Sequence, residues 1–205
     1  EANVGVNKVN YATKRELVHD IAISDSGNIS EVLTYTLRNT ATSTEVRSMG
    51  AGTYSVYLQI LLPRDVSRLS FVLDGIPLAG RDPKDASKPI GPYYEAGDTG
   101  IVQKYGAWLS VPAQAVKRLS VSYDRESTIR PDSSLYGFLL SKQPGVDDMD
   151  SEIRLTYPLY WNAKPVKSVR LLPLSGKSVF LAKNSQLVYN TLLTQDSIVA
   201  VSFSK

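Results

Sequence analysis

The chain repeats one pattern three times: an alternating apolar strand, a proline, a short turn and a second alternating strand. The copies cover residues 54–73, 107–123 and 153–171. Because successive side chains of a strand point to opposite faces, each of these strands buries one face and exposes the other. The pattern predicts hairpins in an all-β protein, built as an antiparallel sandwich.

Alternation predicts further strands on both sides of these copies. Residues 17–24 and 32–38 alternate, and Ser26-Gly27-Asn28 between them predicts a hairpin turn. Residues 40–52, rich in Thr, Ser and Gly, are expected to form a loop. Later strands are expected at 135–140, 179–182, 187–192 and 198–203.

Two stretches interrupt the strands. Residues 74–100 hold four prolines and five glycines, which predicts a long exposed loop of the kind that often carries recognition. Residues 127–134 predict a linker between an N-terminal sandwich, 1–126, and a C-terminal one, 135–205. About seven strands on each side is the number typical of two immunoglobulin-like sandwiches in tandem. One large sandwich of about fourteen strands is the alternative.

Composition narrows the class of protein. The 205 residues are 42% hydrophobic and 21% charged, as expected of a chain with its own core. The net charge of +3 comes with isolated basic pairs, Lys14-Arg15 and Lys117-Arg118, which does not indicate nucleic-acid binding. With no cysteine, disulfides and cysteine metal sites are excluded. No apolar run approaches the roughly 20 residues of a membrane span, and a start at Glu1 without a signal peptide indicates a fragment of a longer chain.

Residue types do not converge on a catalytic site. His19 is the single histidine and lies in phase with Leu17 and Ile21, which predicts a partly buried structural role. Asp20 beside it points to the opposite face. The motif Gly-x-Ser-x-Gly of serine hydrolases is absent. We therefore predict neither an enzyme nor a cofactor.

Two groups of carboxylates are candidates for chemistry. The acidic run contains four possible calcium ligands, Asp147, Asp148, Asp150 and Glu152, but lacks the turn glycine of a calcium loop and is equally typical of a solvated loop. Glycosidases need two carboxylates about 5 to 10 Å apart. Available loop pairs are Glu95 with Asp98 and Asp82 with Asp85, and both are typical of turns.

Aromatic residues near turns offer a possible ligand or partner surface. Tyr93, Tyr94 and Tyr105 flank the 74–100 loop, and Tyr160 and Trp161 follow the third proline. Exposed aromatic rings stack on sugars or anchor protein contacts. Packing of the loops is the alternative role.

Several short phrases resemble the C-terminal extracellular region of large bacterial cell-envelope proteins that contain a domain of unknown function, from Gram-positive and candidate-phyla bacteria. The phrases are Ala2-Asn-Val-Gly-Val-Asn-Lys-Val-Asn-Tyr11, Asn39, Tyr54-Ser-Val-Tyr57, Leu62-Pro63 and Lys142-Gln-Pro-Gly145. The resemblance covers residues 1–160, and 178–205 depart from it. It implies an exported, cell-surface region tethered through a missing N-terminal part, with no established catalytic residues.

Pattern and resemblance together predict a non-catalytic module of the bacterial envelope that is structural or binds a ligand. The expected partners are a cell-wall polymer or another envelope protein. Two alternatives remain open: a carbohydrate-active enzyme or accessory sugar-binding domain, and a spacer without a ligand.

Overall fold

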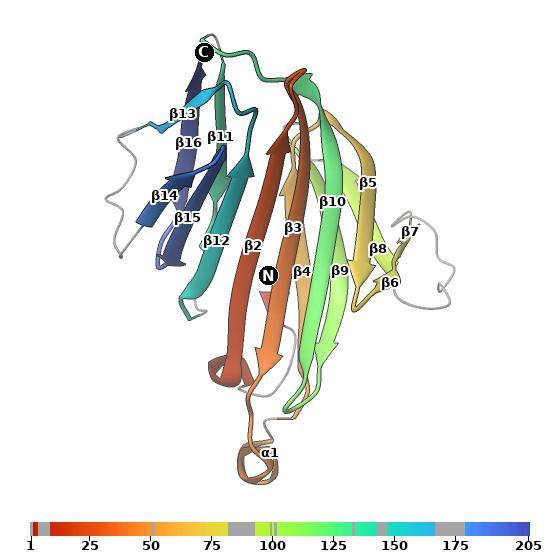
Figure 1. The fold of residues 1–205 in the computed structure, drawn as a ribbon. Helices are drawn as coiled ribbons and strands as arrows, with labels where there is room; N and C mark the ends of the chain where they lie inside the picture. The colour runs from red at the N-terminus through yellow and green to blue at the C-terminus, as the bar shows by residue number, and fades with distance from the viewer. Residues whose placement is uncertain are drawn as a thin grey trace. The chain divides into compact units, whose positions relative to one another are not determined.

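The computed structural model describes residues 2–3, 9–50, 52–81, 93–98, 100, 102–132, 134–142, 147–166 and 179–205. These residues form strands β1 to β16 with a 3₁₀-helix and one α-helix, so the prediction of an all-β protein is confirmed (Figure 1). Tandem immunoglobulin-like sandwiches are not confirmed. In the described part of the chain, no helix is long and apolar enough to cross a membrane.

The chain separates into two compact units that are interleaved in sequence. Unit 1 consists of Glu1–Arg15 and Thr34–Val121, and unit 2 of Glu16–Leu33 and Ser122–Lys205. This differs from the predicted division at 127–134, because two early strands continue from one unit into the other. An alternating pattern shows that a strand exists, but not whether its residues belong to one compact unit or to two.

A five-stranded sheet belongs to unit 1. Its order is β1 (Ala2–Asn3), β4 (Tyr54–Leu62), β9 (Gln103–Val111), β8 (Tyr93–Asp98) and β7 (Ala79–Arg81). Neighbours are antiparallel except β7 and β8, which are parallel. Part of the predicted 74–100 loop is therefore ordered sheet, while residues 82–92 lie outside the described residues.

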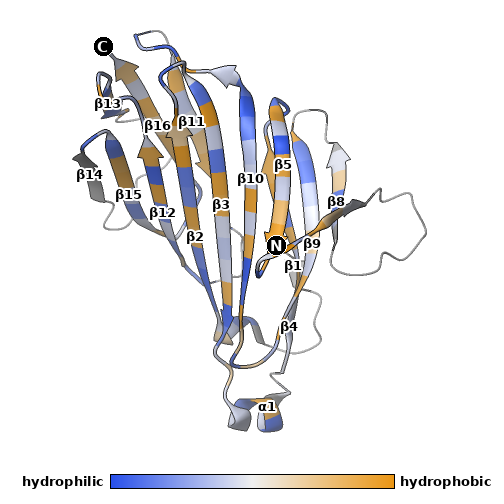
Figure 2. Ribbon diagram, turned by 45° about the vertical axis from the view of Figure 1, so that its right-hand side comes forward, coloured by the Kyte–Doolittle hydropathy of each residue, from blue (hydrophilic) through white to orange (hydrophobic). Residues whose placement is uncertain are grey.

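An eight-stranded sheet contains the strands shared by both units. Its order is β14 (Val179–Lys183), β15 (Gln186–Leu193), β12 (Met149–Thr156), β2 (Thr13–Ile23), β3 (Asn28–Asn39), β10 (Val116–Thr128), β5 (Val66–Leu73) and β6 (Ile76–Pro77). β12 is antiparallel to β15 and parallel to β2. Figure 2 shows hydrophobic and hydrophilic residues alternating along these strands, as the sequence pattern predicted.

A three-stranded sheet belongs to unit 2. Its order is β11 (Leu135–Leu140), β16 (Ser197–Ser204) and β13 (Asn162–Pro165), and both pairings are antiparallel. β16 is central, so the C-terminal strand is held on both sides. The prediction of a strand at 198–203 is confirmed.

The repeated pattern marks crossings between sheets instead of hairpins. In the first two copies the strand before the proline and the strand after it belong to different sheets: β4 and β5, and β9 and β10. In the third copy the strand predicted at 166–171 lies outside the described residues except for Val166, and β13 ends before it. Proline has no N–H for a ladder hydrogen bond, which suits the point where a chain leaves its sheet. In these two copies the strands were predicted correctly, and their pairing as hairpins was wrong.

The turn between β2 and β3 is a hairpin turn as predicted. The Gly27 N–H donates to the carbonyl of Ser24 at 2.8 Å, and Gly27 has φ of 84°. A side chain at this position would also meet the backbone oxygen of Ile129 at 2.1 Å. Both conformation and space therefore require glycine here.

The helix α1 (Ser43–Met49) lies within residues 40–52, which were predicted to be a loop. The 3₁₀-helix η1 (Val9–Ala12) comes earlier in the chain, directly before β2. Thr42 caps α1: its hydroxyl accepts from the Glu45 N–H, and the Glu45 carboxylate accepts from the Thr42 N–H at 2.7 Å. This is a capping box, and its sequence signature, Thr-x-x-Glu, was present in the chain. Gly50 ends the helix with φ of 64°.

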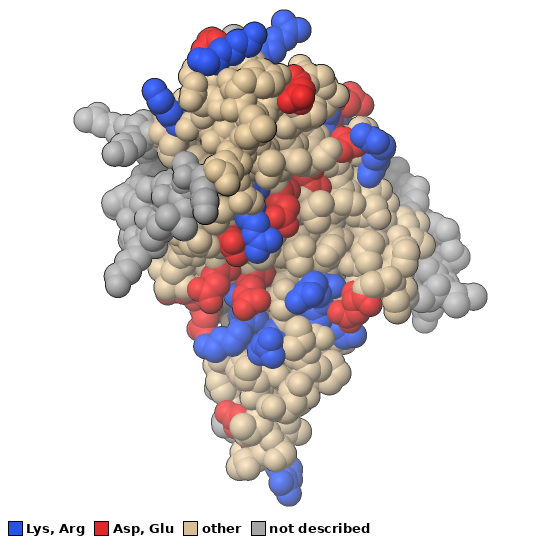
Figure 3. All heavy atoms as spheres, viewed as in Figure 1, with Lys and Arg blue, Asp and Glu red and all other residues tan. Residues whose placement is uncertain are grey.

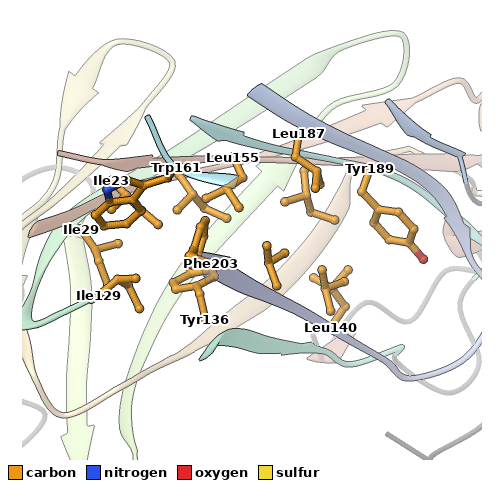
Figure 4. Packing of buried hydrophobic residues seen from close by; sticks show 14 of the residues in the cluster. Ile23, Ile29, Ile129, Tyr136, Leu140, Leu155, Trp161, Leu187, Tyr189 and Phe203 are labelled. Carbon is orange, nitrogen blue, oxygen red and sulfur yellow. The ribbon is translucent and has the colours of Figure 1, made fainter. Parts of the chain in front are cut away.

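The core of unit 2 lies between its two sheets, and Figure 4 shows side chains from both meeting there. Ile153, Leu155 and Tyr189 come from the eight-stranded sheet, and Val201 and Phe203 from β16. In unit 1, Phe71 of β5 contacts Tyr94 and Tyr105 of the five-stranded sheet. Each unit is thus a sandwich-like packing of two sheets.

Candidate functional site

The five-stranded sheet of unit 1 has an inner face in the core and an outer face in solvent. On β4, Tyr54, Val56 and Leu58 are buried, so Tyr57 and Gln59 point outward. Tyr57 pairs with Trp108 on β9, and directly paired residues share a face. The outer face therefore carries a row of polar and aromatic side chains.

One outer side chain crosses a neighbouring strand. The Tyr57 hydroxyl donates to Oε2 of Glu95 on β8 at 3.0 Å, although β9 lies between the two strands. It can do so because residue 106 of β9 is glycine: a Cβ there would lie 2.0 Å from the Tyr57 hydroxyl oxygen. Because Gly106 has no side chain, the Tyr57 hydroxyl can reach across β9 to the Glu95 carboxylate.

Trp108 stands beside this pair. Its ring centroid is 5.1 Å from that of Tyr57 at an interplanar angle of 49°, and 48% of the residue is exposed. Gln59 and Lys104, which pair with Gly106 and Leu61, lie on the same face. We call Tyr57, Gln59, Glu95, Lys104 and Trp108 the outer-face platform.

The platform combines an exposed aromatic ring with hydrogen-bonding groups of every kind. The carboxylate of Glu95 accepts, the ammonium of Lys104 donates and the amide of Gln59 does both. An aromatic ring contributes apolar contact area at a fixed geometry. This arrangement suits a ligand that has an apolar face and a rim of hydroxyl groups.

The tyrosines predicted around the 74–100 loop do not form this surface. Tyr94 stacks on Phe71 at 4.3 Å, and the ring of Tyr105 lies 5.5 Å from Phe71 and 6.0 Å from that of Tyr94. Tyr105 is buried, and burial raises the pKa of its phenol. Strand alternation turns these two rings inward, while the side chain of Tyr93 lies outside the described residues.

The other predicted pair, in unit 2, is split between core and solvent. Trp161 is buried against Phe203, at 5.6 Å between ring centroids, so it lies in the core and is not part of a ligand surface. Tyr160 is exposed, and its hydroxyl donates to the backbone oxygen of Asp25 at 3.3 Å. Adjacent residues at this turn point in different directions.

The acidic run does not gather into a metal site. Among the residues whose placement is described, no group of three or more His, Asp or Glu could hold a metal ion. Glu152 is instead bound by Arg154, whose Nε donates to Oε1 at 3.0 Å. This hydrogen bond, against partial burial, lowers the pKa of Glu152. Glu152, one of the four calcium candidates, is therefore held in an ion pair.

Of the glycosidase pairs, only the Glu95 side chain is described. Asp82 and Asp85, and the side chain of Asp98, lie outside the described residues. The hydroxyl of Tyr57 binds the Glu95 carboxylate, as set out above. This hydrogen bond fixes the position of the Glu95 carboxylate on the platform.

A second polar cluster is buried in unit 2. His19 and Glu31 are 3% and 2% exposed, and Nε2 of His19 lies 2.7 Å from Oε2 of Glu31. The Tyr123 hydroxyl donates to the same oxygen at 2.8 Å. The ring of Phe138 packs edge-on against His19 at 4.9 Å. The partner of His19 is thus a carboxylate on the neighbouring strand, and the buried setting supports the predicted structural role.

The charge of Glu31 is stabilised by its surroundings. Burial by itself would raise the pKa of Glu31, but hydrogen bonds from His19, Tyr123 and Tyr136 and the electrostatic interaction with His19 outweigh it, so that the pKa is lowered. Conversely, burial and the nearby Glu31 raise the pKa of Tyr136. The cluster holds one buried carboxylate in its ionised form.

Comparison with known proteins bears on the fold. No family model and no curated protein matches the chain. A solved structure from Legionella pneumophila, described as a "putative nutrient binding protein", has a TM-score of 0.51 and 10% identity over 96% of this chain and 68% of that one. At this identity the similarity concerns the fold alone.

Two further solved structures show weaker similarity. Yeast LTA4 hydrolase has a TM-score of 0.44 and 11% identity, covering 96% of this chain and 29% of the hydrolase. An M1 zinc metallopeptidase from Deinococcus radiodurans has a TM-score of 0.44 and 14% identity, covering 93% and 42%. The chain spans less than half the length of either protein.

Proposed function

We propose that this chain is a non-catalytic recognition module, and that it binds a glycan through the outer-face platform. The observation that carries the proposal is the exposed Trp108 beside the Tyr57–Glu95 hydrogen bond, with Gly106 leaving the space for it. An aromatic ring in the core is explained by packing alone. Trp108 keeps nearly half of its surface in solvent, so that packing does not account for it.

The chemistry of the platform favours a sugar over other ligands. A pyranose ring has an apolar face of C–H groups that can lie on an indole, and hydroxyl groups that can meet Glu95, Gln59 and Lys104. A strongly charged polymer is less suited, because the platform combines a carboxylate, Glu95, with an ammonium, Lys104, on adjacent strands. Basic and acidic side chains are also intermingled on the face of the molecule that Figure 3 shows. We infer a ligand such as a cell-wall polymer with exposed sugar rings.

The setting that we propose is the bacterial cell surface. Its support is the resemblance of the opening residues and of Lys142-Gln-Pro-Gly145 to envelope proteins. A binding role also agrees with the description of the Legionella pneumophila protein of similar fold. Another envelope protein is a possible second partner.

Binding of the purified chain to isolated bacterial cell walls and to a glycan panel tests the proposal. We expect saturable binding that survives moderate salt, and a loss of about tenfold or more in Trp108→Ala, since tenfold corresponds to about 1.4 kcal/mol. Tyr160→Ala is the matched control, because Tyr160 is an exposed aromatic residue of unit 2. Equal losses in both variants would contradict the proposal, and absence of binding would favour a spacer.

A further inference from the structure

The side chains of the outer-face platform lie in rows along β4 and β9, and Leu61 belongs to the last of these rows. Each row is a pair of directly opposed residues, one from each strand: Tyr57 with Trp108, Gln59 with Gly106, and Leu61 with Lys104. Every second residue of a strand points to the same face, so all three rows point outward. The surface therefore runs on from the aromatic pair to an end formed by Leu61 and Lys104.

The three rows together are too long for one sugar. A strand rises about 3.3–3.4 Å per residue, so the four residues from Tyr57 to Leu61 cover about 13 Å. A pyranose ring is closed by single bonds of about 1.5 Å, so one sugar covers less than half of this length. A linear chain of about three sugars reaches from the first row to the third.

Each row offers a contact of its own. Trp108 in the first row has an exposed ring that can lie against the apolar face of a sugar. In the second row the amide of Gln59, which is exposed, can donate to and accept from hydroxyl groups. In the third row Leu61 is 60% exposed and adds apolar surface beside the ammonium of Lys104. Successive sugars of one chain would each meet one of these rows.

The rows are open to solvent along their length. Trp108 and Leu61, at the two ends, are 48% and 60% exposed, and Gln59 between them is exposed too. A protein site for a single small molecule is concave and buries about 70–90% of its ligand. This open face would cover a single sugar from one side only, so one sugar gains little contact here.

Several sugars of one chain overcome this limit. Association costs translational and rotational freedom, and that cost falls once on each ligand molecule. A second or third sugar joined to a bound one adds its contacts without a further cost of this kind. An open face with contact groups in three rows therefore favours a chain over a single sugar.

We propose that the ligand is a linear glycan, of which about three consecutive sugars lie along β4 and β9 from Trp108 to Leu61. This inference rests on the proposed glycan binding and narrows the ligand to polymers and their longer fragments. Trp108 holds the first sugar by stacking. Gln59 and Glu95 bind hydroxyl groups of the second sugar. Leu61 and Lys104 contact the third.

Competition with fragments of isolated bacterial cell walls tests this proposal. The walls are partly hydrolysed, the released chains are separated into sizes of one to six sugars, and each size competes with intact walls for the protein. The concentration that displaces half of the protein should fall at least about tenfold between one sugar and three. From three sugars to six it should fall by no more than roughly fourfold, because a six-sugar chain contains four stretches of three.

The outcomes of this competition separate the inference from the proposed function. Equal competition by one sugar and by three, or a steep gain beyond three, would overturn the inference and leave glycan binding in place. Failure of every size to displace intact walls that do bind the protein would contradict glycan binding itself.

A variant at the far end of the rows tests the direction of the chain. Leu61→Ala should weaken three-sugar chains about threefold or more and leave one sugar unchanged, whereas Trp108→Ala should weaken every size. Leu139→Ala is the matched control, because Leu139 is also a leucine that is 60% exposed on a strand, but in unit 2. Circular dichroism checks that the variants fold. An equal effect of Leu61→Ala and Leu139→Ala on three-sugar chains would show that the glycan does not run along β4 and β9.

Discussion

Replacement of Glu31 by glutamine tests the energetic role of the buried cluster in unit 2. The change removes a charge that accepts from His19 at 2.7 Å and from Tyr123 at 2.8 Å and lies 3.6 Å from Arg125. Hydrogen bonds to charged groups contribute about 1.5–3 kcal/mol each, and removal of one member of a buried ion pair costs about 3–5 kcal/mol. Because the amide of glutamine retains part of the hydrogen bonding, we expect the free energy of unfolding to fall by about 3 kcal/mol.

The pH dependence of this loss follows from the lowered pKa of Glu31. A carboxyl group with a folded-state pKa below its unfolded value stabilises the fold above the unfolded value, here 4.5, and the contribution disappears as the pH falls through the folded value. The difference between Glu31→Gln and wild type should therefore be largest near neutral pH and shrink below about pH 4.5.

Urea unfolding at pH 7 and in acid measures both effects, and thermal unfolding should show a fall in Tm of about 6–12 °C at neutral pH. Glu126→Gln, at an exposed glutamate of the same strand as Tyr123, is the control and should change stability by less than about 0.5 kcal/mol. If Glu31→Gln were as mild as the control, or its cost did not depend on pH, the reasoning would be refuted.

Three further predictions concern single positions. Gly27→Ala should destabilise the fold by several kcal/mol more than Gly75→Ala, because both have φ of 84° but only the first places a Cβ 2.1 Å from the backbone oxygen of Ile129; equal Tm values would contradict this. Since the pKa of Tyr136 is raised, its contribution to stability is present below about pH 10 and lost above it, so Tyr136→Phe should flatten the alkaline decline seen by circular dichroism. Thr42→Ala should cost about 1 kcal/mol in urea unfolding through loss of the capping box, and a negligible change would show that the cap is not needed.

Strands were the most predictable part of the fold. Alternation located β4, β5 and β16 nearly to the residue, since one face of each is buried. Pairing was not predictable in the same way. The strands on either side of Pro63, and those on either side of Pro112, belong to different sheets, a relation fixed by contacts between residues far apart in sequence. The interleaving of the two units has the same origin, because β2 and β3 serve both.

The platform was only partly predictable. Trp108 lies out of phase with the buried Ala107, Leu109 and Val111, so alternation alone could have placed it on the solvent face. Its association with Tyr57 and Glu95 depends on the order of β4, β9 and β8, which the sequence pattern does not contain. The tyrosines near the 74–100 loop are candidates by their position in the sequence, but strand register turns Tyr94 and Tyr105 inward.

The central claim is most directly tested by saturation binding of wild type, Gly106→Ala and Gly97→Ala to isolated bacterial cell walls. A Cβ at Gly106 would displace the Tyr57 hydroxyl from Glu95, whereas a Cβ at Gly97 of the same sheet would make ordinary contacts of 3.7 Å or more with Lys104. We predict that wild type and Gly97→Ala bind alike and that Gly106→Ala, still folded, binds at least about tenfold more weakly. Unchanged binding by folded Gly106→Ala would contradict a glycan site on the outer-face platform.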